Sequence, residues 1–256
     1  MKNISLLLLA GSALLLASCD KLSTPQPVTV SGQVKELIVS DTGAATYTGW
    51  TGGAGKVIAS VEGQDNLATA ALAADGKFSL TLPKLDAALL SPINFSSDLP
   101  AGCTGDLKTS GASDARGNAA SFRVEAAQKS GEIAPAALET TFSGSNLTAL
   151  KIQSGGYVYA DKAVGLSGKL NCTENGTPVT SDINLQLGAG WNKVTFTIST
   201  TQQGGTVSST VSVTTGSLPA QWIYLEGASS LSQQALNGSA LAQPALKVAK
   251  ALPFFR

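Results

Sequence analysis

The chain has 256 residues, 17 basic and 17 acidic side chains, and no histidine. Hydrophobic residues make up 43% of it and charged residues only 13%, which is typical of a neutral globular protein. A neutral chain lacks the basic excess on which nucleic-acid binding depends, so nucleic acid is excluded as a partner. The absence of histidine also excludes Ser-His-Asp and Cys-His catalytic sites.

The N-terminal segment is typical of an export signal. A weakly positive start is followed by an apolar run from Ile4 to Leu16, which is too short to cross a membrane as a helix. The run ends in Leu16-Ala17-Ser18-Cys19, which resembles the lipobox of bacterial lipoproteins. The resemblance implies a signal peptide over residues 1–18 and a diacylglycerol on Cys19. The alternative is an ordinary secretory signal with a chance cysteine.

Residues 19–27 are predicted to be the lipidated cysteine and a polar tether that contains Pro25 and Pro27. Two or three acyl chains hold a protein stably on a membrane, whereas one chain binds only marginally. We therefore expect a cell-envelope lipoprotein, anchored in a membrane and facing the periplasm or the exterior. Asp20 resembles the inner-membrane retention signal of enterobacterial lipoproteins, but which membrane the protein occupies stays open.

Cysteine usage gives a second indication of export. Of the three cysteines, Cys19 is assigned to the lipid, which leaves the pair Cys103 and Cys172. An even remainder in an oxidising compartment predicts a disulfide, with two separate thiols as the alternative. Two cysteines without histidine cannot supply four soft ligands, so no metal site is expected.

Alternating apolar residues bounded by turn residues predict strands in the first part of the mature chain. We expect strands over Val28–Val34, Val57–Val61, Leu67–Leu72 and Phe78–Leu82, with a tight turn at Asp75-Gly76 before the last of them. The segments "VTVSGQV", "KVIASVEG" and "ADGKFSLTLP" resemble prealbumin-like, carboxypeptidase-regulatory-like β-sandwich modules. The resemblance implies a sandwich over residues 28–85 that acts as a spacer or binding platform without chemistry of its own.

Residues 86–229 are predicted to form a larger β-rich domain. Frequent Pro and Gly in its first part predict long loops with few strands, such as Ala120–Ala126. Later alternation predicts a meander of strands over Tyr157–Tyr159, Val164–Leu170, Ile183–Leu187, Val194–Ile198, Val207–Val213 and Trp222–Leu225. We expect Trp191, beside a glycine turn, to pack at one end of the core rather than to form an exposed platform.

Residues 230–256 form a C-terminal tail in which Ala245, Val248, Ala249 and Leu252 would share one face of a short helix. We expect this segment to pack on the sandwich or to fray, because the stretch between Pro244 and Pro253 is only about two turns long. Contact of its lysines with lipid headgroups is the alternative. The predicted fold class is therefore all-β: an antiparallel β-sandwich module, a larger β-rich region and a short helical C-terminal segment.

Two motifs resemble catalytic or phosphate-binding sites but lack essential parts. Asp41-Thr42-Gly43 resembles the triplet of aspartic proteases, which need two such carboxylates, so we predict a turn there. The glycine-rich segment 52–56 resembles a phosphate loop, but Trp50 and Val57 occupy the positions of its first Gly and its Ser/Thr. A glycosidase-like pair of carboxylates stays open, because spacing alone does not identify one.

The sequence therefore predicts no catalytic residue and no cofactor. It predicts a lipid-anchored cell-envelope protein with a binding or structural role. The expected partners are the membrane, through the lipid on Cys19, and a protein or glycan of the envelope. The alternative is an envelope hydrolase that uses a carboxylate pair.

Overall fold

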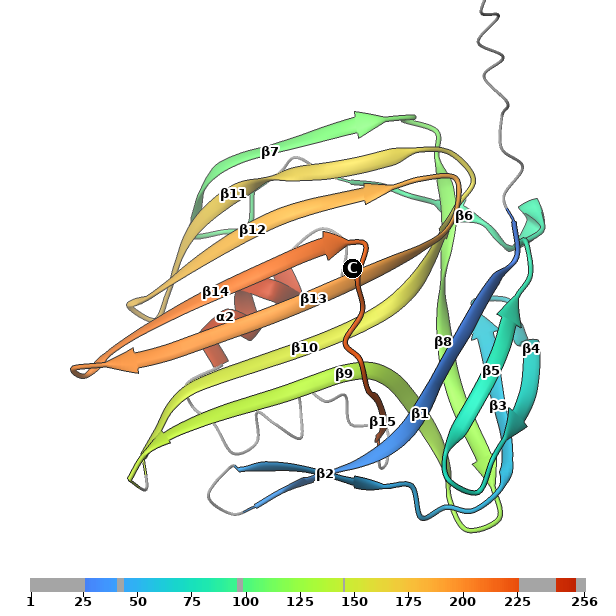
Figure 1. Ribbon diagram of the computed structural model, residues 1–256. Coiled ribbons are helices and arrows are strands. Elements are labelled where there is room, and N and C mark those ends of the chain that lie inside the picture. The colour runs from blue at the N-terminus through green and yellow to red at the C-terminus, as the bar shows by residue number, and fades with distance from the viewer. Residues whose placement is uncertain (1–25, 41–43, 96–98, 145, 226–242, 252–256) are drawn as a thin grey trace, which may run out of the picture.

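The computed structural model describes residues 26–40, 44–95, 99–144, 146–225 and 243–251. This part of the chain is almost entirely β-structure, which confirms the predicted all-β class (Figure 1). The strands are β1 (Val28–Val39), β2 (Ala45–Gly49), β3 (Gly55–Val61), β4 (Gln64–Leu72), β5 (Lys77–Leu82), β6 (Ser91–Pro92), β7 (Cys103–Gly111), β8 (Arg116–Ala126), β9 (Ser130–Ser143), β10 (Asn146–Ala160), β11 (Val164–Glu174), β12 (Thr177–Leu187), β13 (Gly190–Gln203), β14 (Thr206–Thr215) and β15 (Trp222–Leu225). A 3-10 turn, η1 (Ala87–Leu89), and a helix, α2 (Gln243–Ala251), complete it.

Seven strands close on one another in the order β1-β5-β4-β3-β8-β9-β15, and β15 returns to β1. We call this unit the ring. Its interior holds a cluster of buried apolar side chains, including Val30, Val57, Leu80, Phe122 and Trp222. Each strand of the ring therefore has a partner on both sides, although the pairing of β4 with β5 is limited to Leu72 and Phe78.

The second unit, which we call the curved sheet, consists of six strands in the order β10-β13-β14-β12-β11-β7 (Figure 1). Its pairs are antiparallel except β12 and β14, which run parallel, as do β1 and β15 in the ring. The alternation of apolar residues predicted the strands over Val164–Leu170, Ile183–Leu187 and Val207–Val213. It could not reveal their order, because alternation carries no information on which strand lies next to which.

Strands β8 and β9 join the two units, because each changes partner along its length. Residues 117–120 of β8 pair with β10, whereas residues 121–126 pair with β3 in the ring. Likewise, residues 132–135 of β9 pair with β15 and residues 136–143 pair with β10. Strands β1 to β5 therefore share a sheet with later strands of the chain. The division at residue 85, between a prealbumin-like module and a second domain, stays a prediction.

The expectation of long loops after residue 86 is wrong, since β7, β8, β9 and the start of β10 occupy most of that segment. The reason lies in the change of partner. The buried residues of β9 are Ile133, Pro135, Ala136 and Leu138. Pro135 and Ala136 are successive positions, and they lie where the strand passes from the ring to the curved sheet. A strand that changes its buried face halfway shows no continuous period of two.

The predicted disulfide is present between Cys103 and Cys172, which lie directly opposite each other on β7 and β11. Strand β7 is the last strand of the curved sheet and pairs with β11 alone in the described part of the chain. The bond therefore fastens an edge strand. With a sequence separation of 69 residues, chain entropy alone gives a stabilisation of about 4 kcal/mol.

Trp222 of β15 lies at the centre of the ring. Its indole makes edge-to-face contacts with Phe78 and Phe122, with ring centroids 5.1 and 5.0 Å away. The space that it occupies depends on Gly32 of β1. A Cβ atom on Gly32 would lie 2.2 Å from Cδ1 of Trp222, far inside van der Waals contact. The glycine in the first predicted strand is thus explained by the packing of a residue 190 positions later (222 − 32).

We expect Gly32→Ala to lower the free energy of unfolding by about 1–3 kcal/mol, because the added methyl group must displace a buried indole. Urea unfolding followed by tryptophan fluorescence would measure the loss. Gly49→Ala on β2 is the matched control, since a Cβ atom there meets nothing within 4 Å. Equal stability of the two variants would contradict this account of the ring.

Candidate functional site

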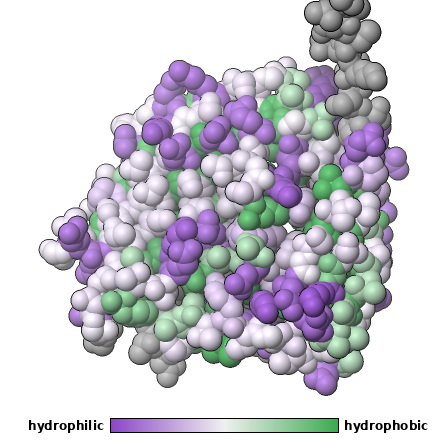
Figure 2. All heavy atoms as spheres, viewed as in Figure 1, coloured by the Kyte–Doolittle hydropathy of each residue, from purple (hydrophilic) through white to green (hydrophobic). Residues whose placement is uncertain are grey.

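The two faces of the curved sheet differ in chemistry. On β12 the buried side chains of Val179, Ile183, Leu185 and Leu187 alternate with polar residues that point to the opposite face. In Figure 1 α2 lies behind β13 and β14, and Figure 2, from the same side, shows mainly pale and purple atoms over these strands. The many Thr and Ser residues of the sequence therefore cover the outward face, and the inward face is apolar.

Helix α2 covers part of the inward face and contacts β11, β12, β13 and β14. Its Ala245 and Val248 are buried in the same apolar cluster as the inward residues of the sheet. On its exposed side Lys247 forms an ion pair with Glu174 at the end of β11. Of the two outcomes expected for this segment, the structure has packing, through Ala245 and Val248. Leu252 and the side chain of Ala249 lie outside the described residues.

The same inward face also borders a cavity of about 480 Å³. Apolar side chains of four strands form its floor, and residues 92–95 form the opposite wall. A hydrogen bond from the Ile93 amide to the Ala115 carbonyl, 2.9 Å long, fixes this wall to the turn before β8. The lining residues that carry the argument are Ile93, Phe95, Gly156, Leu185, Leu187 and Val194.

The cavity exists because two successive inward positions of β10 carry almost no side chain. Ser154 and Gly156 stand opposite Phe196 and Val194 of β13, between the bulkier inward residues Ile152 and Val158. A Cβ atom built on Gly156 would meet nothing within 4 Å. Gly156 also has an ordinary negative φ, so the backbone does not require glycine there. Its absent side chain leaves room in the cavity.

A second, smaller cavity of about 300 Å³ adjoins the first and shares Ile93, Asn94 and Phe95 with it. Its other wall is the end of β7 and the turn that follows. The polar side chains among its lining residues are those of Asn94, Thr109, Ser110 and Ser113. The two cavities therefore lie side by side, one apolar and one lined by hydroxyl and amide groups.

Among the residues that the structure describes, no Asp, Glu, Lys or Arg lines either cavity. The carboxylate pair of a hydrolase would have to face such a cavity, with the two groups close to the bond to be cleaved. In the described ranges, no group of three or more His, Cys, Asp or Glu side chains could hold a metal ion. The described lining of these two cavities therefore supplies apolar, hydroxyl and amide groups for binding.

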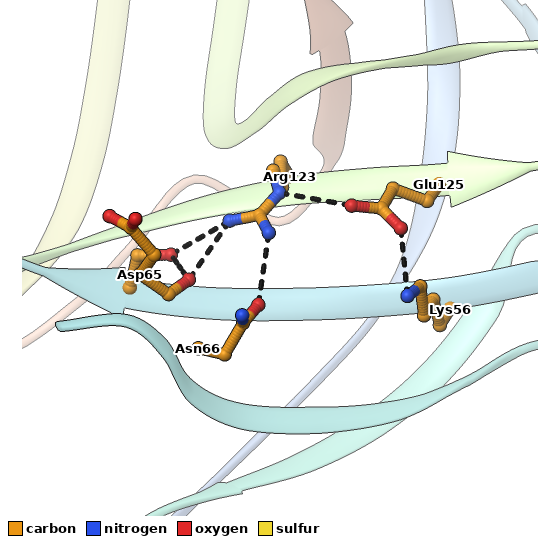
Figure 3. Close-up of polar contacts among 6 residues, drawn as sticks. Lys56, Asp65, Asn66, Arg123 and Glu125 are labelled. Carbon is orange, nitrogen blue, oxygen red and sulfur yellow. Dashed lines mark hydrogen bonds and ion pairs between the residues drawn. The ribbon is translucent and has the colours of Figure 1, made fainter.

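A prominent cluster of charges lies on the outer surface of the ring and serves the fold (Figure 3). Arg123 of β8 donates hydrogen bonds to the Ser60 hydroxyl, the Asp65 carbonyl and the Asn66 side chain, each 3.0 Å long. Its Nε–H reaches Glu125, which pairs with Lys56 at 2.8 Å. Because the β3–β4 register shifts next to Ser60, the guanidinium fastens an irregular point of the ladder.

The other residues singled out from the sequence lie apart from the cavities. Cys19 and Asp41-Thr42-Gly43 are outside the described residues. The 52–56 segment folds over Trp50, whose indole N–H donates to the Gly53 carbonyl at 2.8 Å. Trp191 donates to the Pro83 carbonyl at 2.7 Å and contacts Tyr159 edge-on, so it is packed as expected.

Comparison with known proteins yields no relative: no family model, no curated protein and no solved structure matches the chain. Among the helices of the described residues, none has the length and apolar character needed to cross a membrane. The cavity was not predicted from the sequence. A local signal was present, however, in the Ser-Gly-Gly at positions 154–156 within a strand, since glycine in a strand often marks a place where another group approaches.

Glu36 of β1 is a largely enclosed carboxylate, with 17% of its side chain exposed, and it has several partners. It accepts hydrogen bonds from the Thr51 amide at 2.9 Å and the Thr51 hydroxyl at 2.7 Å, and it pairs with Lys129 at 2.8 Å. Burial alone would raise the pKa of Glu36, but the hydrogen bonds from Lys129 and Thr51 outweigh it and lower the pKa below its ordinary value. Glu36 thus ties β1 to the β8–β9 turn.

The lowered pKa of Glu36 predicts a pH-dependent contribution to stability. The contribution is present above the unfolded pKa of about 4.3 and is lost as the pH falls through the folded pKa. We expect Glu36→Gln to lower the free energy of unfolding by about 1 kcal/mol at neutral pH, with the difference vanishing in acid. Urea unfolding over a pH series would measure it.

Glu139→Gln is the control for this titration. Glu139 pairs with Lys151 at 3.1 Å, but its side chain is 62% exposed. An exposed ion pair contributes little, so we expect a change below about 0.5 kcal/mol at any pH. A deficit of Glu36→Gln that stayed constant down to acid pH would contradict the role of the charge.

Proposed function

We propose that this protein is a lipid-anchored binding protein of the cell envelope that holds an apolar ligand in the larger cavity of its curved sheet. The observation that carries the proposal is the cavity of about 480 Å³ on the inward face, kept open by Gly156. Its size lies within the range of about 300–1,000 Å³ in which small-molecule sites fall.

The lining of the cavity supports an apolar occupant. Phe95, Leu185, Leu187 and Val194 are among the lining residues, and the polar side chains beside them, Asn94 and Ser154, are uncharged. Transfer of apolar surface from water into such a site is favourable by about 25 cal/mol for each Å² buried. A hydrocarbon chain fits this chemistry better than a sugar or a peptide, whose polar groups would lose hydrogen bonds to water there.

The resemblance of Leu16-Ala17-Ser18-Cys19 to a lipobox supports the second part of the proposal, the lipid anchor. A diacylated Cys19 would hold the domain beside a bilayer through the tether of residues 20–27. Lipids are then the most concentrated apolar molecules near the cavity. The alternative, a hydrolase with a carboxylate pair, has less support, because neither described cavity is lined by an acidic residue.

Filling the cavity tests the binding function directly. We expect the purified protein to bind N-phenylnaphthylamine, an uncharged dye that fluoresces in apolar sites, and Gly156→Leu to weaken this binding at least about tenfold, or about 1.4 kcal/mol. The leucine side chain would occupy the empty volume beside Val194 and Phe196. Fluorescence titration measures the affinity, and urea unfolding checks that the variant is folded.

Two further forms make this test specific. Gly49→Leu introduces the same side chain on β2, where a Cβ atom also meets nothing within 4 Å, and should bind the dye as the unaltered protein does. A form that ends at Ala251 tests the chain's own apolar end, residues 252–256, as the occupant. Dye binding by this shortened form alone, or equal binding by the Gly156→Leu form, would overturn the proposal.

The anchor has its own test. We expect the protein extracted from membranes of a lipoprotein-processing bacterium to show a mass that corresponds to loss of residues 1–18 and addition of acyl chains. Cys19→Ala should abolish both the added mass and the membrane association, because no thiol remains to be acylated. Intact mass spectrometry and membrane fractionation would measure these outcomes. An unacylated protein in the soluble fraction would show that the lipoprotein interpretation is wrong.

A further inference from the structure

Building on the proposed function, we infer that the ligand is an amphiphile with an uncharged, hydroxyl-bearing headgroup, with its hydrocarbon tail in the larger cavity and its headgroup in the smaller one. The inference rests on the position of the smaller cavity of about 300 Å³. It shares the residues Ile93, Asn94 and Phe95 with the apolar cavity, so one molecule can contact both.

The lining of the smaller cavity fits a neutral polar group. Thr109 of β7 lies opposite Leu166 of β11, and the turn after β7 adds Ser113. Asn94 contributes an amide, which can both donate and accept hydrogen bonds. Hydroxyl groups of a ligand can exchange their hydrogen bonds to water for bonds to these groups at little net cost.

A charged headgroup fits less well, because none of the described residues that line the two cavities is Asp, Glu, Lys or Arg. Asp114 follows the lining residue Ser113 in the sequence, but it forms an ion pair with Lys162, so the two charges neutralise each other. An anionic or cationic headgroup would give up part of its hydration without meeting an opposite charge, and that loss is costly. The site should therefore discriminate by headgroup charge at equal tail length.

Competition with the bound dye tests this selectivity. We expect monopalmitoylglycerol, which is neutral and carries two hydroxyl groups, to displace N-phenylnaphthylamine at concentrations at least about tenfold lower than palmitate, which has the same tail and a negative charge. Equal displacement by the two lipids, or tighter binding of palmitate, would overturn the inference and leave the proposed function standing. Failure of the protein to bind the dye or either lipid would overturn the proposed function itself.

A charge placed in the smaller cavity gives an independent test. Thr109→Lys should shift the preference toward palmitate by at least about tenfold relative to the unaltered protein, because the ammonium group supplies the missing opposite charge. Thr104→Lys adds the same charge to β7 outside both cavities and should leave the preference unaltered. An unchanged preference in Thr109→Lys would place the headgroup elsewhere and overturn the inference.

Discussion

The pairing of β8 and β9 with two sets of partners is the constraint on which the rest of the structure depends. Backbone amide and carbonyl groups buried away from water must be paired, so a strand that leaves one sheet has to enter another. Residues 117–120 of β8 and 136–143 of β9 both pair along one edge of β10. This arrangement fixes the curved sheet to the ring and starts its curvature.

In this arrangement the curved sheet has an apolar inward face, and the rest of the fold must shield that face from water. A sheet with one apolar face must cover that face or leave a surface that attracts other molecules. Helix α2 covers one part with the buried side chains of Ala245 and Val248, and its Lys247 pairs with Glu174 at the surface. Residues 92–95 stand over another part, and the cavity is the space between this wall and the small residues of β10.

The ring serves as a rigid support for this site. Its interior is filled by large aromatic side chains in edge-to-face contact, among them Trp222 with Phe78 and Phe122. Tyr157 of β10 belongs to the same cluster, while its neighbours Gly156 and Val158 line the cavity on the other side of the strand. Tyr157 thus faces the ring while the adjacent Gly156 faces the site, which couples the position of the cavity floor to a well-packed core.

The sequence by itself determined the all-β class, the Asp75-Gly76 turn, most later strands and the Cys103–Cys172 pair. These features depend on the local alternation of apolar residues, on the residue types in turns and on the number of cysteines, all of which are visible in a single sequence. Only the tertiary structure decided that β1 to β5 close with β8, β9 and β15, and that Ser154 and Gly156 face an open space. The physical reason is that strand order and the facing of small residues depend on which distant segments pair. That information resides in the packing of the whole chain and in no short stretch of it.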